Sequence, residues 1–122
     1  MLGKMIMALV GLATATAASA QWVPGMEIHN QDVQVQTAGV VNTVHFLPDG
    51  TATIKSASGA TMVDATWNAN DGKLCIKTAS TSDCYPYQSP FAARTPVDLR
   101  SDCGVQSRFT ALATGVLPGE RG

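Results

Sequence analysis

The stretch WNANDGKLCIKTASTSDCYPY, residues 67–87, decides the fold that the sequence predicts. Residues 68–72 form a run of turn residues, because asparagine and aspartate bond their own backbone and Gly72 takes a positive φ without steric cost. Residues 73–77 then alternate with the period of a β-strand. The small polar residues 78–83 indicate a second turn. The stretch therefore predicts a β-hairpin whose second strand returns toward Tyr87.

Two cysteines occupy matching positions in this hairpin. Cys75 and Cys84 lie directly opposite each other if the register is symmetric about Ala79 and Ser80. Opposed residues have Cβ atoms roughly 4.5–5.5 Å apart and a disulfide needs about 3.8 Å, so a non-hydrogen-bonded pair suits a bridge best. We predict a Cys75–Cys84 disulfide with Cys103 as the odd thiol. Two alternatives stay open at this point: both hairpin cysteines are reduced and buried, or Cys84 pairs with Cys103.

The N-terminal residues have the pattern of a signal peptide. Lys4 gives a positive start, and the mostly apolar run that follows is short for a membrane span. Ala18-Ser19-Ala20 fits the small-x-small rule, which predicts cleavage between Ala20 and Gln21. We therefore expect a signal peptide over 1–20, a single β domain over 21–115 and a flexible C-terminal tail over 116–122.

Charge and localisation exclude several classes of partner. Removing Lys4 with the signal peptide changes the formal net charge from −1 to −2, and no basic cluster follows it. We therefore expect no nucleic-acid partner, and no membrane span after signal removal. A periplasmic or secreted location is predicted, where disulfides persist. The partner would be an envelope or extracellular ligand or protein that the sequence does not name.

The remaining segments predict more short strands. Pro48-Asp49-Gly50 is the strongest turn signal, because proline presets φ and glycine takes the left-handed position. No window shows helical recurrence of apolar residues. We predict an all-β fold, a small antiparallel sandwich or barrel-like meander of about seven or eight short strands, preceded by a signal-peptide helix. The expected core residues are Val44, Phe46, Ile54, Trp67, Leu74 and Ile76.

The sequence offers little recognisable chemistry. His29 and His45 are the only histidines, and a metal site usually needs three or four ligands. Cys103 would need a neighbouring histidine to act as a nucleophile. The loop after Asn68 lacks the oxygen ligands of a calcium site, since Ala79 takes the twelfth position. We therefore predict no catalytic residue, no metal and no cofactor.

One aromatic cluster suggests recognition. Tyr85, Tyr87 and Phe91 lie near a strand end and a proline-containing loop, where aromatic residues can form a recognition surface. The alternative is that they close one end of the core. The pattern leaves both interpretations open.

The order of several motifs resembles small exported proteins of proteobacteria. These motifs are Phe46-x-Pro48-Asp49-Gly50-Thr51, Trp67, Gly72-x-Leu74-Cys75 and Cys84-Tyr85, which together cover about residues 40–87. The resemblance implies an exported β-rich domain with a Cys75–Cys84 bridge. It carries no catalytic residue to this chain, and it does not account for Cys103.

Two classes of function remain. The first is a non-enzymatic exported module that binds a ligand or a protein, in the manner of an inhibitor. The second is a small cell-envelope enzyme, such as a hydrolase. The absence of a recognisable acid–base or nucleophilic constellation favours the first class.

Overall fold

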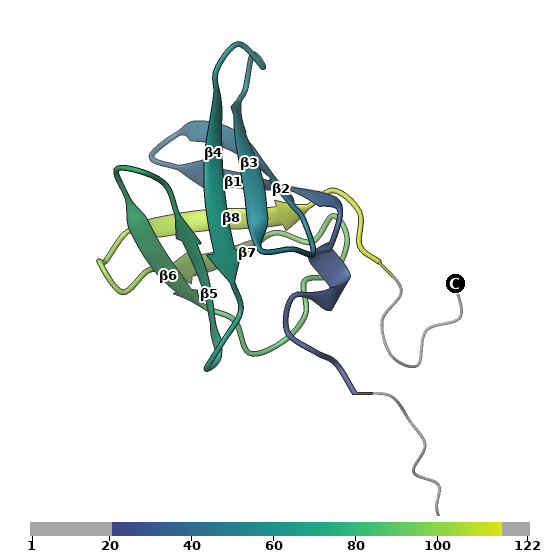
Figure 1. Ribbon diagram of the computed structural model, residues 1–122. Helices are drawn as coiled ribbons and strands as arrows, with labels where there is room; N and C mark the ends of the chain where they lie inside the picture. The colour runs from purple at the N-terminus through teal and green to yellow at the C-terminus, as the bar shows by residue number, and fades with distance from the viewer. Residues whose placement is uncertain (1–20, 116–122) are drawn as a thin grey trace, which may run out of the picture.

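A computed structural model describes residues 21–115, and its one sheet of eight antiparallel strands confirms the all-β prediction (Figure 1). The strands are β1 (Gln31–Thr37), β2 (Val40–Phe46), β3 (Thr51–Ser56), β4 (Met62–Asn68), β5 (Lys73–Lys77), β6 (Ser82–Pro86), β7 (Val97–Arg100) and β8 (Gln106–Ala111). The order across the sheet is β6-β5-β4-β3-β2-β1-β8-β7. The expected signal-peptide helix and C-terminal tail lie outside the described residues.

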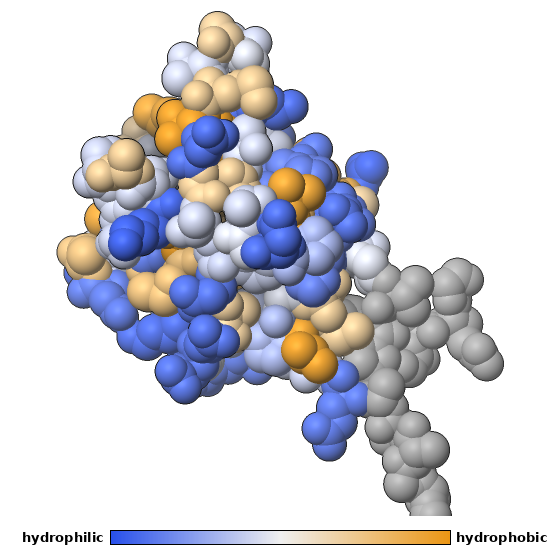
Figure 2. All heavy atoms as spheres, in the orientation of Figure 1, coloured by the Kyte–Doolittle hydropathy of each residue, from blue (hydrophilic) through white to orange (hydrophobic). Residues whose placement is uncertain are grey.

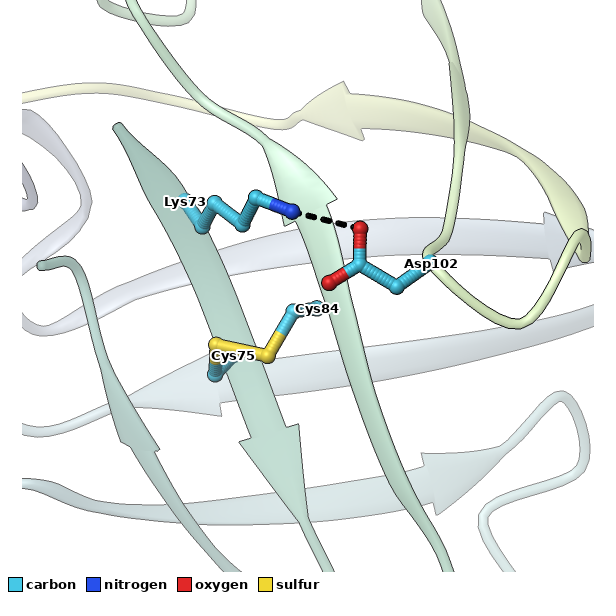
Figure 3. Close-up of a disulfide and its surroundings, with 4 residues drawn as sticks. All are labelled: Lys73, Cys75, Cys84 and Asp102. Carbon is cyan, nitrogen blue, oxygen red and sulfur yellow. Dashed lines mark hydrogen bonds and ion pairs between the residues drawn. A yellow bond between two sulfur atoms is a disulfide. The ribbon is translucent and has the colours of Figure 1, made fainter. Parts of the chain in front are cut away.

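The sheet is barrel-like, because it curls until its two outermost strands meet. No ladder joins β6 to β7, and contacts from the β7–β8 turn bridge the seam instead. The backbone N–H of Asp102 donates to the carbonyl oxygen of Cys84 at 3.0 Å. The Asp102 carboxylate also pairs with the Lys73 ammonium at 2.5 Å (Figure 3). Of the two predicted architectures, the structure has the barrel-like one.

The hairpin of β5 and β6 has the predicted register. Cys75 lies opposite Cys84, and their sulfur atoms are 2.04 Å apart (Figure 3). Their neighbour Leu74 is fully buried, so the alternation of the strand puts the two cysteines on the outer face. The structure thus supports the predicted pair, with Cys103 exposed in the β7–β8 turn.

Inward-facing residues of every strand except β7 supply buried side chains, and Leu99 of β7 packs against them. Val44, Phe46, Trp67 and Leu74 are buried as predicted. Ile54 and Ile76 are only partly buried. The difference comes from their position, because both line a hollow at one end of the barrel. The remaining buried apolar residues are Ile28, Val33, Ala52, Ala65, Tyr85, Tyr87, Phe91, Phe109 and Ala111.

The opposite end is covered by the segment that precedes β1, and we name it the closed end. A short 3₁₀ turn, η2 (Met26–Ile28), lies across it and buries Ile28 completely (Figure 1). Gly25 begins this turn with φ +95°, and a Cβ there would stand 2.9 Å from the Trp67 ring. Only glycine suits both the backbone and the close approach.

The aromatic cluster, for which the sequence left a recognition surface or core closure open, is buried. Tyr85, Tyr87 and Phe91 are 6%, 3% and 3% exposed, so they close the core as the alternative held. Their rings point inward and contact one another through Phe109. The ring centroids are 5.2 Å apart for Tyr87 and Phe91, 5.9 Å for Phe91 and Phe109, and 4.8 Å for Phe109 and Tyr85.

The face of the molecule drawn in Figure 2 carries hydrophilic groups with smaller apolar groups between them. The larger exposed apolar residues include Val40 and Met62. Strand β4 pairs with β5 only from Thr66 to Asn68, so its first residues project beyond the sheet with β3 (Figure 1). Within residues 21–115, no helix has the length and apolar character that a membrane crossing requires.

Candidate functional site

The end of the barrel opposite η2, which no segment within residues 21–115 covers and which we name the open end, holds a hollow of about 170 Å³. The β1–β2, β3–β4, β5–β6 and β7–β8 turns all lie at this end. An eight-stranded barrel has an interior that its own side chains fill or that holds one small ligand. The lining residues are Val35, Asn42, Val44, Ile54, Ile76, Thr78, Thr81, Asp83, Tyr85 and Phe109.

Two polar side chains face the interior here, where the pattern of the strands otherwise supplies apolar ones. Asn42 shares its face with Val44 and Phe46, and Asp83 shares its face with Tyr85. Within residues 21–115, the Asn42 amide makes no side-chain hydrogen bond, and Asp83 belongs to none of the three ion pairs. Both side chains are partly exposed and therefore stay hydrated in the mouth of the hollow.

Cys103 lies beside the same mouth. Interaction with the Asp83 carboxylate, and to a smaller extent the charge of Asp102, raises the pKa of Cys103 above the ordinary value. A raised pKa reduces the thiolate, which is the nucleophilic form of cysteine. The position of Cys103 therefore favours an inert thiol over a catalytic one.

The inner wall of the hollow is uncharged. Burial raises the pKa of Tyr85, and a hydrogen bond with Ser107 only partly opposes that effect. The Ser107 hydroxyl is itself 2.6 Å from the Thr37 hydroxyl. Tyr85 consequently remains a neutral phenol at ordinary pH, and Asp83 provides the only formal charge among the lining residues.

A second hollow, of about 600 Å³, lies outside the barrel where β4 separates from β5. It is broad and lined mainly by small side chains. The charged residues at its border are Asp64 and Lys77. Thr78 lines both hollows, so the two meet at the β5–β6 turn. Its small side chains provide few directed contacts, and we regard the inner hollow as the better-formed site.

The closed end contains a buried carboxylate that the sequence analysis did not single out. Glu27 is 0% exposed. Its Oε1 accepts a hydrogen bond from the Trp22 indole at 2.8 Å, and its Oε2 accepts from the Tyr87 hydroxyl at 2.5 Å and the Phe91 N–H at 2.8 Å. The Glu27 carbonyl accepts from the Gly115 N–H at 2.8 Å.

This network joins three segments that are far apart in the chain, around Glu27, around Tyr87 and at Gly115. Three donors satisfy the carboxylate, which a buried charge requires. Burial, and then the hydrogen bond to Glu27, raise the pKa of Tyr87 far above its ordinary value. Glu27 lines neither hollow, so we assign it to the architecture of the closed end rather than to ligand contact.

The other residues considered from sequence occupy separate positions. The His45 ring lies 2.8 Å from the Asp32 carboxylate on the outer face, and His29 contacts the Trp67 ring edge to face. Asp98 pairs with Arg108 at 2.9 Å. Residues 21–115 contain no cluster of three or more residues able to hold a metal ion.

Sequence reasoning missed Asn42 and Asp83 as site residues. A signal for Asn42 was present, because its place in the alternation of β2 is one that apolar residues otherwise take. Asp83 lies at a strand start, where aspartate is also a common turn residue. Comparison of the chain with protein-family models, with curated proteins and with solved structures found no match.

Proposed function

We propose that this protein is a non-enzymatic exported binding module whose ligand enters the open end of the barrel. One observation carries the proposal. Asn42 and Asp83 line a hollow whose strand-borne walls are otherwise mainly apolar, at the end of the barrel opposite η2, and within residues 21–115 no segment lies across that end. Convergent polar groups in a concave apolar site are the usual mark of a ligand pocket.

The asymmetry between the two ends supports this assignment. At the closed end η2 and the Glu27 network fill the interior, whereas the open end keeps a hollow of about 170 Å³. The Cys75–Cys84 pair lies on the wall beside that hollow and restrains two of its strands. A rigid wall lowers the entropic cost of binding.

Export of the chain follows from the signal-peptide pattern and is part of the proposal. The Ala18-Ser19-Ala20 triplet and the paired cysteines both suit an oxidising compartment. We do not propose the alternative, a small envelope hydrolase, because no constellation in the described residues favours it. The Cys103 thiol is kept protonated by two carboxylates instead of being activated by a base.

The test is a nuclear magnetic resonance titration of the mature chain, residues 21–122, with fractions of an envelope extract and a library of small metabolites. A ligand should shift the amide signals of Asn42, Ile54, Ile76 and Asp83. In the Val35→Phe variant a larger side chain fills the hollow, and binding should be lost.

The matched control is Val40→Phe. It makes the same substitution at a residue that is 60% exposed and does not line the hollow, so binding should persist. A ligand whose binding survives Val35→Phe, or shifts confined to the outer face, would refute the proposed site.

A further inference from the structure

We infer that the hollow takes a primary ammonium group carried on a short aliphatic body, an inference that rests on the proposed function. The open-end hollow is negatively charged at its mouth, apolar along its wall and small. These three properties together define one class of ligand.

Charge is the first argument. Among the described residues, 21–115, Asp83 is the only charged one that lines the hollow. The neighbouring carboxylate of Asp102 is paired with the Lys73 ammonium, so the charge argument rests on Asp83 alone. A cationic group would therefore be attracted there, and an anionic ligand would be repelled.

Hydrogen-bonding capacity is the second argument. An ammonium group has three donors and no acceptor. The Asp83 carboxylate and the Asn42 amide oxygen supply acceptors at the mouth. The hydroxyls of Thr78 and Thr81 are 2.8 Å apart and bond mainly within their own turn. Charge-assisted bonds to Asp83 would thus be the main polar contacts.

The wall is the third argument. Val44, Ile54 and Ile76 offer aliphatic surface, and Tyr85 and Phe109 add aromatic rings, which are attractive to cations. A molecule of water occupies about 30 Å³ in the liquid. The hollow of about 170 Å³ therefore accommodates a body of only a few non-hydrogen atoms.

Two sources share this chemistry: a free alkylamine and the lysine side chain of a partner protein. Both present an ammonium group on about four or five methylene groups. The inference concerns that shared group, and the experiment separates the sources.

The experiment titrates mature protein at pH 7 with n-pentylamine, n-pentanol and pentanoate, followed by amide shifts. A ligand of so few atoms should bind with a dissociation constant of about a millimolar. We expect the amine to bind at least tenfold more tightly than the alcohol, and pentanoate not to bind. Asp83→Asn should raise the dissociation constant of the amine at least tenfold and leave that of the alcohol unchanged.

Asp71→Asn is the matched control. It removes the same charge in the β4–β5 turn near the closed end, at φ +57°, a conformation that asparagine tolerates. Binding of the amine should be unchanged. Asn42→Leu is a second test variant if Asp83→Asn does not fold. It too should weaken binding of the amine and leave binding of the alcohol unchanged.

The outcomes separate this inference from the proposed function. The ammonium inference is overturned if the amine and the alcohol bind equally tightly, or if neither Asp83→Asn nor Asn42→Leu changes binding of the amine. The proposed function survives that result if another ligand binds to the parent protein and fails to bind to Val35→Phe. Nα-acetyl-lysine methylamide separates the two sources. Tighter binding than pentylamine supports a partner's lysine, and weaker binding supports a free amine.

Discussion

The Tyr87 hydroxyl donates a 2.5 Å hydrogen bond to the buried Glu27 carboxylate, and this contact joins the residue that follows β6 to the segment that precedes β1. The same hydroxyl accepts from the Gly25 N–H at 3.0 Å. Polar groups thus hold one end of the barrel shut, whereas polar groups at the other end face a hollow. The two ends therefore have different roles, one structural and one available for binding.

The first prediction concerns the buried carboxylate. Glu27→Gln replaces one acceptor oxygen by an NH₂ group that would face N–H or O–H donors. We expect the free energy of unfolding to fall by roughly 2–4 kcal/mol, because a buried donor loses its partner and the remaining bonds lose their charge. Urea denaturation of the mature protein measures this.

Its control is Asp64→Asn, which makes the same chemical change at an exposed position of β4. That variant should stay within about 0.5 kcal/mol of the parent. Equal stabilities for Glu27→Gln and Asp64→Asn would show that the Glu27 network contributes nothing to the closed end.

The second prediction concerns alkaline pH. The pKa of Tyr87 is raised in the folded protein, mainly by burial and then by Glu27. The unfolded chain therefore releases this proton at lower pH than the folded one, at about pH 10. Titration of Tyr87 should leave the free energy of unfolding unchanged below about pH 9 and should decrease it as the pH rises through 10.

Tyr87→Phe removes the titrating group. Its stability should be lower than that of the parent at pH 7, and its decrease between pH 9 and 11 should be shallower. Denaturation at a series of pH values measures both slopes. If the free energy of unfolding decreases equally steeply with pH in the parent and in Tyr87→Phe, Tyr87 does not cause the loss of stability at alkaline pH.

The sequence predicted the strands well because their signals are local. The Pro48-Asp49-Gly50 turn and the alternation in β5 each depend on neighbouring residues only. The Cys75–Cys84 register followed from the same kind of local symmetry. Period-2 patterning also identified most of the core, since it records which face of a strand is buried.

The closed end was not predictable in this way. Glu27 meets Tyr87 and Phe91 across 60 and 64 positions of chain, and nothing near Glu27 in the sequence indicates those donors. The burial of the aromatic cluster has the same origin. Whether Phe91 lies on a surface or in a core depends on Phe109, which is supplied by another strand. Asp83 was missed because its role depends on how the sheet curls.

The third prediction is processing. Lys4, the apolar run and Ala18-Ser19-Ala20 predict cleavage after Ala20, so that the exported protein begins at Gln21. Intact mass spectrometry of the exported protein should show a chain that lacks residues 1–20. Ala20→Lys should block cleavage, because the cleavage site requires a small residue. A full-length mass for the exported parent protein would contradict the prediction.

The last prediction is the contribution of the disulfide. Cys75 and Cys84 are separated by nine positions, and closing a loop of that size stabilises a protein by about 2–3 kcal/mol in the chain-entropy model. Cys75→Ser and Cys84→Ser should each lower the free energy of unfolding by about that amount. A reducing agent should bring the parent to the level of the variants. Denaturation curves measured with and without reductant provide the test.

Cys103→Ser is the matched control, because Cys103 is exposed and its thiol is outside the pair. It should change stability by less than about 0.5 kcal/mol. Non-reducing peptide mapping of the exported protein identifies the bridge directly. A Cys84–Cys103 peptide, or labelling of Cys75 by a thiol reagent in the folded oxidised protein, would show that the hairpin pairing is wrong. Either result would also mean that no Cys75–Cys84 bridge holds β5 and β6 together beside the hollow.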